Sequence, residues 1–208
     1  MKSPGPTLVA RPSDPALVEQ PARTAEQGDP AAHRRRRDLD NPRSLTGSSA
    51  LIPTLLVCMP LVKLDQQTTG VNDIARANAV MVLDEMVQGI HAAREHGITI
   101  GMGTDSALTY VTHYDTWREL DLLVRVGGLT PAQTLNAATR TNARILGLDD
   151  ITGSIEPGKA ADLVVLAANP LDGFRAFTDV RMVVARGMVI DQPSVTRYAE
   201  LNAQLDTF

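Results

Sequence analysis

The sequence predicts an α/β protein in which a strand–helix–strand unit is followed by a small region of strands. Three observations carry this prediction. A mostly apolar run covers residues 51–58, a helical apolar pattern covers residues 73–96, and a short β-branched run bounded by glycines leads from Gly97 to Ser106. A strand, a helix and a strand in this order form a βαβ unit, which implies parallel strands.

The first strand is predicted for Leu51–Cys58, where Pro53 lies near the start and its missing amide costs least. The helix after it has apolar residues three and four positions apart, which is typical of an amphipathic helix. These residues are Ile74, Ala77, Val80, Leu83, Val87 and Ile90. Gly97 then stands where a glycine commonly ends a helix.

The second strand ends at Asp105. Parallel α/β sheets carry their chemistry at the carboxyl ends of the strands, so Asp105 is the first candidate for a functional residue. An aspartate after a strand also commonly caps the next helix, and the strand pattern alone leaves both interpretations open. His113, in the loop after this strand, is the second candidate, and it either faces a site or lies on the surface. His91 and His96 are five residues apart on a helix, so we expect them to point to different faces at the surface.

Two more helices are predicted, at residues 116–126 and 130–146. The second begins with a capping box, in which Thr130 is the N-cap residue and Gln133 is the third helical residue. Pro131 occupies the first helical position, where a missing amide is harmless.

From residue 151 on, the pattern predicts a small β region. Residues 161–167 form a continuous apolar strand, and residues 180–185 and 188–190 form a hairpin across Arg186-Gly187. Residues 153–159 nearly match a phosphate-binding loop, which needs a Ser or Thr after its lysine and then a helix. An alanine and a strand come next instead, so we interpret this segment as a turn.

The composition favours a globular protein without a general affinity for nucleic acid or membranes. The chain has 208 residues, of which 43% are hydrophobic, and a net charge of −4. Cys58 is the only cysteine, which excludes a disulfide within the chain and indicates a reducing, cytoplasmic location. Residues 1–48 are rich in proline and arginine and lack a periodic apolar pattern, so we expect them to be disordered.

Several motifs in a fixed order resemble the C-terminal part of the amidohydrolase superfamily, and most closely its imidazolonepropionase-like and Xaa-Pro-dipeptidase-like members. They lie within about residues 51–191. The motifs are Gly103-Thr104-Asp105-Ser106, His113 with Arg118-Glu119-Leu120, Gly128-Leu129-Thr130-Pro131-Ala132-Gln133-Thr134-Leu135 with Ala137-Ala138-Thr139, Asn142-Ala143-Arg144-Ile145-Leu146-Gly147, and Gly153-Ser154-Ile155-Glu156-Pro157-Gly158-Lys159-Ala160-Ala161-Asp162-Leu163-Val164-Val165-Leu166.

The resemblance implies an α/β fold that is an incomplete (β/α)8 barrel, made of the last strands and helices, plus part of a small composite β domain. Residues 49–148 are then the C-terminal part of the barrel. Residues 149–195 supply strands of the composite β domain, and residues 196–208 form a C-terminal tail.

The resemblance also implies a metal-dependent hydrolase that acts on the carbon–nitrogen bond of a small-molecule substrate, either a non-peptide amide, a cyclic amide or a dipeptide. The implied cofactor is a divalent metal, which we expect to be zinc. Asp105 is then both a metal ligand and the catalytic base, and His113 is a substrate-binding residue.

The sequence departs from the family pattern in its ligands. The family takes further metal ligands from a His-x-His on strand one, a Lys or Glu on strand four, and a His on each of strands five and six. None of these has a counterpart here. We therefore expect the chain to be truncated and inactive alone, and to form a homo-oligomer or pair with a complementing chain. The alternative is a non-catalytic interaction module that pairs through its exposed barrel edge.

Overall fold

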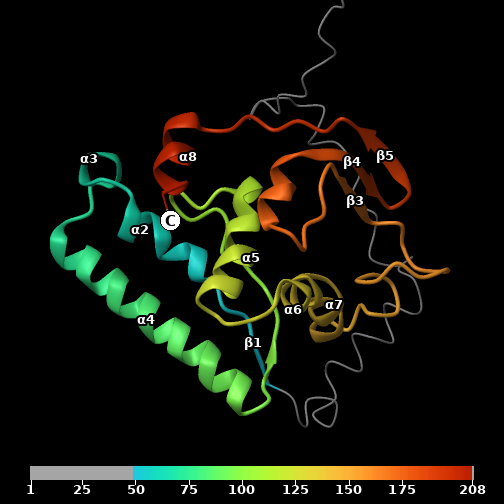
Figure 1. The fold of residues 1–208 in the computed structure, drawn as a ribbon, viewed down its shortest axis with the longest axis horizontal. Helices are drawn as coiled ribbons and strands as arrows, with labels where there is room; N and C mark the ends of the chain where they lie inside the picture. Colours follow the sequence, from blue (N-terminus) through green and yellow to red (C-terminus); the bar gives the residue numbers. More distant parts are fainter. Residues whose placement is uncertain (1–48, 208) are drawn as a thin grey trace, which may run out of the picture. The chain divides into compact units, whose positions relative to one another are not determined.

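The computed structural model describes residues 49–207, and the expected disorder of residues 1–48 lies outside them (Figure 1). The described chain begins with strand β1 (Ala50–Leu51), which pairs in parallel with strand β2 (Thr99–Ile100). Helix α4 (Asp73–Glu95) connects the two strands. The predicted βαβ unit is therefore confirmed, although closure of a barrel is not seen within the described residues.

The first strand is much shorter than predicted, and the expectation of a strand over Leu51–Cys58 is wrong. After β1 the chain turns into the 3-10 helix η3 (Leu55–Val57) and the helix α2 (Met59–Lys63). The side chains of η3 fill the core, where Leu55 is 0% exposed. A short apolar run has no period that separates a buried strand from a buried helix.

Helix α4 begins at the predicted residue and ends one residue earlier than predicted, with His96 as its C-cap and Gly97, whose φ is 66°, directly after it. The predicted apolar face is wrong over the first turns of the helix. Ile74 is 73% exposed and Val80 is 49% exposed, whereas the nearby Ala79 is buried. The true inward stripe contacts η3 and α2, and its members are Ala79, Leu83, Met86, Val87, Ile90 and Ala93. A short helix, α3 (Gln66–Thr69), precedes α4.

The two helices predicted after β2 are both present. The first is α5 (Thr116–Arg125), which comes after the short 3-10 helix η4 (His113–Asp115). The second is a continuous helical run of three parts, which are α6 (Pro131–Asn136), the π-helical turn η5 (Ala137–Thr141) and α7 (Asn142–Ile145). Its capping box is confirmed, because the Gln133 amide donates to Thr130 Oγ1 at 3.2 Å and the Thr130 amide donates to Gln133 Oε1 at 2.9 Å.

The predicted β region is a three-stranded antiparallel sheet in the order β3–β4–β5. Its strands are β3 (Leu163–Leu166), β4 (Val180–Ala185) and β5 (Met188–Asp191). The hairpin across Arg186 and Gly187 is confirmed, and both residues have the positive φ that a tight two-residue hairpin turn requires.

The segment that nearly matches a phosphate-binding loop is a turn, as interpreted. It leads into a strand, and Lys159 Nζ donates to Ser154 Oγ at 2.5 Å within the turn. Helix η6 (Phe174–Thr178), between β3 and β4, packs on α5 through a cluster that holds Phe174, Trp117 and Leu120.

The C-terminal segment is fixed to the core by a buried arginine. Helix α8 (Ala199–Leu205) lies within the expected tail of residues 196–208. Arg118 donates to the Leu205 carbonyl at 2.9 Å and to Asp206 Oδ1 at 2.7 Å. Arg175 donates to the other oxygen of Asp206 at 2.6 Å, and both guanidinium groups lie against the Trp117 ring. Within the part of the chain described, every helix is too short or too polar to cross a membrane.

This arrangement predicts that Asp206→Ala weakens the attachment of α8 to α5. The substitution removes the acceptor shared by two guanidinium groups, while Arg118 keeps the Leu205 carbonyl and Asp115, so we expect a loss of about 1–3 kcal/mol in the free energy of unfolding. Chemical denaturation measures the loss. The emission of Trp117, the only tryptophan, should shift as its two cationic neighbours move. Asp172→Ala, at an exposed aspartate, is the control, and equal stability of the two variants would contradict the prediction.

Candidate active site

The candidate site is where the chain leaves the two parallel strands. The Gly101 amide donates to the Leu51 carbonyl at 2.9 Å, which continues the ladder beyond β2. Further on, a Cβ atom added to Gly103 would lie 2.9 Å from Ile52 Cγ2 and 3.4 Å from Thr54 Cγ2. The segments after β1 and β2 therefore run side by side, and glycine at 103 permits their close approach.

Asp105 lies at the end of this second segment, as predicted, and its side chain is exposed. Its φ is 55°, in the left-handed region that side chains other than glycine rarely adopt. Ala107 and Tyr110 in the same loop also have positive φ values, 85° and 68°. Such strained residues persist only where the surroundings hold them, and they gather at functional sites.

Several hydrogen bonds hold this loop in place, and two of them fix its far end. The Val111 amide donates to the Leu108 carbonyl at 3.0 Å, and Tyr110 Oη donates to the Thr68 carbonyl at 2.5 Å. The second contact connects the loop to helix α3, which comes from the segment after β1. The backbone at Asp105 is thus part of a loop that is fixed at its far end.

His113 comes after this loop as the first residue of η4, and its side chain is exposed. Its ring stands edge-on to Tyr114, with 5.5 Å between the ring centroids and an angle of 74°. Tyr114 is in turn covered by Arg197, and its hydroxyl accepts the Tyr198 amide at 3.1 Å. No interaction brings His113 and Asp105 together among residues 49–207, so the role of His113 stays a prediction. His91 and His96 are both exposed, as expected.

Sequence reasoning missed the buried carboxyl group of Glu119. It lies on α5 with 0% exposure and accepts the amides of Leu55 at 3.1 Å and Leu56 at 2.7 Å. Burial raises the pKa of Glu119 to about 8, against the two amide hydrogen bonds, which lower it. The available signal was its position one turn before Leu123, on the apolar stripe of an amphipathic helix.

The described residues do not fit the metal that the resemblance implies. Across residues 49–207, no three His, Cys, Asp or Glu side chains lie together in a way that could hold a metal ion. Asp105 is a single carboxylate, whereas a catalytic zinc ion takes about three ligands from the protein. Any further ligands would have to come from outside these residues.

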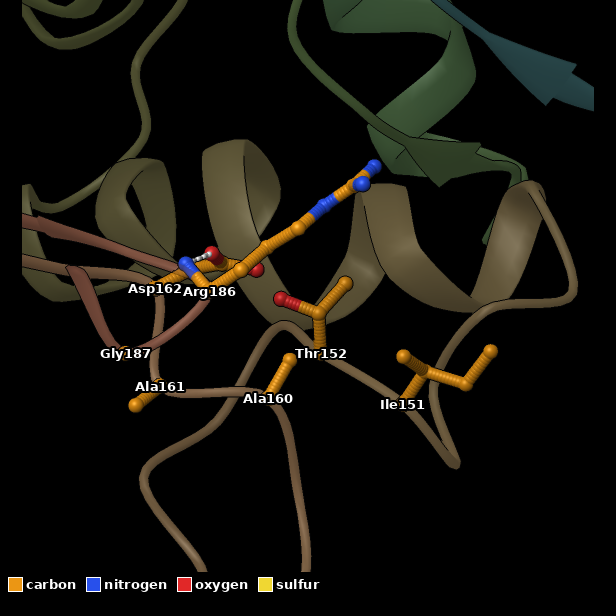
Figure 2. Close-up of a pocket in the computed structure, with 7 residues that line it drawn as sticks. All are labelled: Ile151, Thr152, Ala160, Ala161, Asp162, Arg186 and Gly187. Atoms are coloured by element: carbon orange, nitrogen blue, oxygen red, sulfur yellow. Dashed lines mark hydrogen bonds between the residues drawn. The ribbon is translucent and has the colours of Figure 1, made fainter.

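A pocket of about 580 Å³ opens elsewhere, between the Ile151–Thr152 segment and the β4–β5 turn (Figure 2). Neither Asp105 nor His113 lines it. Its carboxylate, Asp162, accepts the Arg186 amide at 2.8 Å and so supports the positive φ of that residue. This pocket therefore belongs to the hairpin turn and is separate from the candidate site.

Comparison with known proteins gives the family. The model of the amidohydrolase family matches residues 33–196, which is more than half of the chain. Ochratoxinase of Aspergillus niger is 32% identical over 101 residues, which cover 48% of this chain and 20% of the relative. Imidazolonepropionase of Thermoplasma acidophilum is 32% identical over 114 residues, which cover 53% of this chain and 28% of the relative.

A solved structure is also similar to this chain. The crystal structure of a Bifidobacterium longum protein, provisionally named a prolidase, superimposes with a TM-score of 0.74 and 50% sequence identity. The match covers 80% of this chain and 41% of that protein. This chain belongs to the amidohydrolase family, and it spans less than half the length of these relatives.

The raised pKa of Glu119 predicts how stability depends on pH. Between pH 4.5 and about 8 the folded chain keeps a proton on Glu119 that the unfolded chain loses. The free energy of unfolding should therefore fall as pH rises through this window, by about 1.4 kcal/mol for each unit of pKa shift at most. Urea denaturation at several pH values measures the slope.

Glu119→Gln removes the titrating group, so its stability should be nearly constant across the same window. It should be less stable than the wild type at the acidic end, because its amide nitrogen cannot accept the second backbone amide. Glu85→Gln, at an exposed position on α4, should keep the wild-type slope. Parallel slopes for the wild type and Glu119→Gln would refute the explanation.

Proposed function

We propose that this chain is part of a hydrolase that cleaves carbon–nitrogen bonds in small molecules, such as an amide, a cyclic amide or a dipeptide. The observation that carries the proposal is the place of Asp105, which comes after β2 at the point where the exits of two parallel strands run side by side. Membership in the amidohydrolase family supports the reaction class. The name prolidase supports a dipeptide as the substrate, and the name imidazolonepropionase supports a cyclic amide.

Asp105 would act as the general base in this reaction. An exposed carboxylate at a strand exit can accept a proton from the water molecule that attacks the carbonyl carbon. As a ligand for a divalent metal, which we expect to be zinc, it would be one of several, and the others lie outside residues 49–207. His113, in the exposed segment after the strained loop, would bind the substrate.

This proposal makes the chain inactive alone. Residues 49–148 would contribute the last strands and helices of a barrel, and residues 149–195 strands of a small β domain, to a catalytic unit completed by a second polypeptide. The net charge of −4 and the single buried cysteine support a small-molecule substrate and a cytoplasmic location.

A second candidate function is a non-catalytic interaction module, which the exposed apolar surface favours. Strand β5 is an edge strand, and Met188, Val189 and Ile190 on it are between 49% and 70% exposed. The strand ends in the exposed Asp191, and the three apolar residues before it leave most of this edge without the charged side chains that usually protect one. The same surface would serve either a complementing chain or a second copy of this one.

The hydrolase proposal is tested by complementation. We expect the chain to hydrolyse an Xaa-Pro dipeptide only when it is mixed with zinc and the part of the Bifidobacterium longum protein that it does not cover. Asp105→Asn should lower the rate about 10²- to 10⁴-fold, because the amide cannot accept the proton. Asp172→Asn, at an exposed aspartate, should keep the rate.

The chain without its complement is the negative control. Elemental mass spectrometry should find far less than one zinc ion per chain in it, because one carboxylate does not hold the metal. Equal rates for wild-type and Asp105→Asn mixtures would remove Asp105 from the mechanism. A mixture that associates and hydrolyses nothing would favour the interaction module.

The exposed edge predicts self-association of the purified chain. We expect sedimentation velocity to show oligomers, and Val189→Lys to shift the distribution toward the monomer, since a charge at an edge opposes strand pairing. Gln192→Lys, just beyond the strand, adds the same charge as a control. A compact wild-type monomer that melts cooperatively would contradict the prediction.

A further inference from the structure

Strand β2 has a second edge, which faces away from β1. The Gly101 amide points toward β1, because it donates to the Leu51 carbonyl. Backbone groups alternate along an extended chain, so the amide and the carbonyl of Met102 point to the opposite edge. Unpaired groups at such an edge are a template for a further strand.

The side chain of Asn142 fills this edge. Its Oδ1 accepts the Met102 amide at 3.0 Å, and its Nδ2 donates to the Met102 carbonyl at 2.7 Å. A side-chain amide offers one acceptor and donors in a fixed plane, so it satisfies both groups of Met102 as the backbone of a neighbouring strand would. Asn142 thus replaces a strand at a single residue.

Two local features allow this contact, a glycine in the strand segment and a π-helical turn in the helical run. A Cβ atom on Gly101 would collide with Asn142 Oδ1 and lie 2.9 Å from Ile145 Cδ1, so glycine is needed for α7 to come this close. The π-helical turn η5 immediately precedes Asn142. Such a turn adds one residue to the helix and rotates the next helical turn by about 100°, which decides the side of the helix on which Asn142 lies.

We infer that Asn142 is a positioning residue that fixes the segment from Met102 to Asp105. It acts by tying Met102 from the side opposite β1, three residues before the strained backbone of Asp105. The inference rests on the proposed function only for the chemical role of Asp105.

Amide exchange of Met102, monitored by NMR, tests the inference without any assay of activity. Asn142→Leu removes both hydrogen bonds, and exchange at Met102 should become about 10- to 100-fold faster. The scalar coupling that reports the φ angle of Asp105 should change in the same variant. Asn136→Leu is the matched control, since Asn136 is exposed and its side chain donates to the Thr141 hydroxyl at 3.4 Å, within the same helical run.

Asn142→Asp separates hydrogen bonding from packing. Above its pKa of about 4 the introduced carboxylate cannot donate to the Met102 carbonyl, whereas the protonated form can. The carboxylate still accepts the Met102 amide, so exchange at Met102 in Asn142→Asp should stay slower than in the similarly sized Asn142→Leu. A difference of this kind is not expected from a residue that only fills space.

Unchanged exchange at Met102 in Asn142→Leu, or equal exchange in Asn142→Asp and Asn142→Leu, would overturn the inference. If either variant loses protection throughout the chain, it has not folded, and a measurement on the wild-type protein then tests the inference. Its Asn142 Nδ2 protons should then exchange more slowly than those of Asn136. Equal exchange of the two side-chain amides would refute the contact. Failure of the hydrolase proposal would leave all these outcomes unchanged.

Discussion

The buried carboxyl group of Glu119 is the contact on which the rest of the structure depends. It accepts the amides of Leu55 and Leu56, and so holds the segment after β1 against helix α5. A carboxyl group in the core is costly unless its oxygens are paired, and burial here keeps its proton on. The contact turns the chain inward after two residues of strand, which places Thr54 beside Gly103 at the candidate site.

Hydrogen bonds from side chains to the backbone recur where the strands are short. Strands β1 and β2 pair over only two residues each, too few to fix the segments beyond them. Side chains supply the missing backbone partners, through Glu119 at Leu56, Asn142 at Met102 and Arg118 at the Leu205 carbonyl. Each joins elements that are remote in the sequence. Substitution of any one of them therefore acts on a junction and leaves the helices themselves intact.

Elements that depend on local signals could be predicted from the sequence. The prediction failed where the local structure depends on a residue that is distant in the sequence. The capping box at Thr130 and the hairpin turn at Arg186 are local, and both were found. The strand over residues 51–58 was wrong, because the Glu119 that accepts its amides lies 63 residues away from Leu56. The position of Asp105 after a strand was also predicted from local pattern, and its role stays a prediction. Asn142 was missed because its partner is 40 residues distant.

Family membership and a complete metal site are separate properties of the described residues. A site assembled at the ends of many strands receives one or two groups from each, so a chain with two of those strands can position a group without completing the chemistry. Asp105 illustrates this separation. Its loop is fixed at Thr68 through Tyr110, and its strand is fixed on both edges, yet no cluster of ligands forms among the described residues. The placement of the carboxylate depends on residues within the chain, whereas the chemistry proposed for it needs ligands that the described residues do not gather around it.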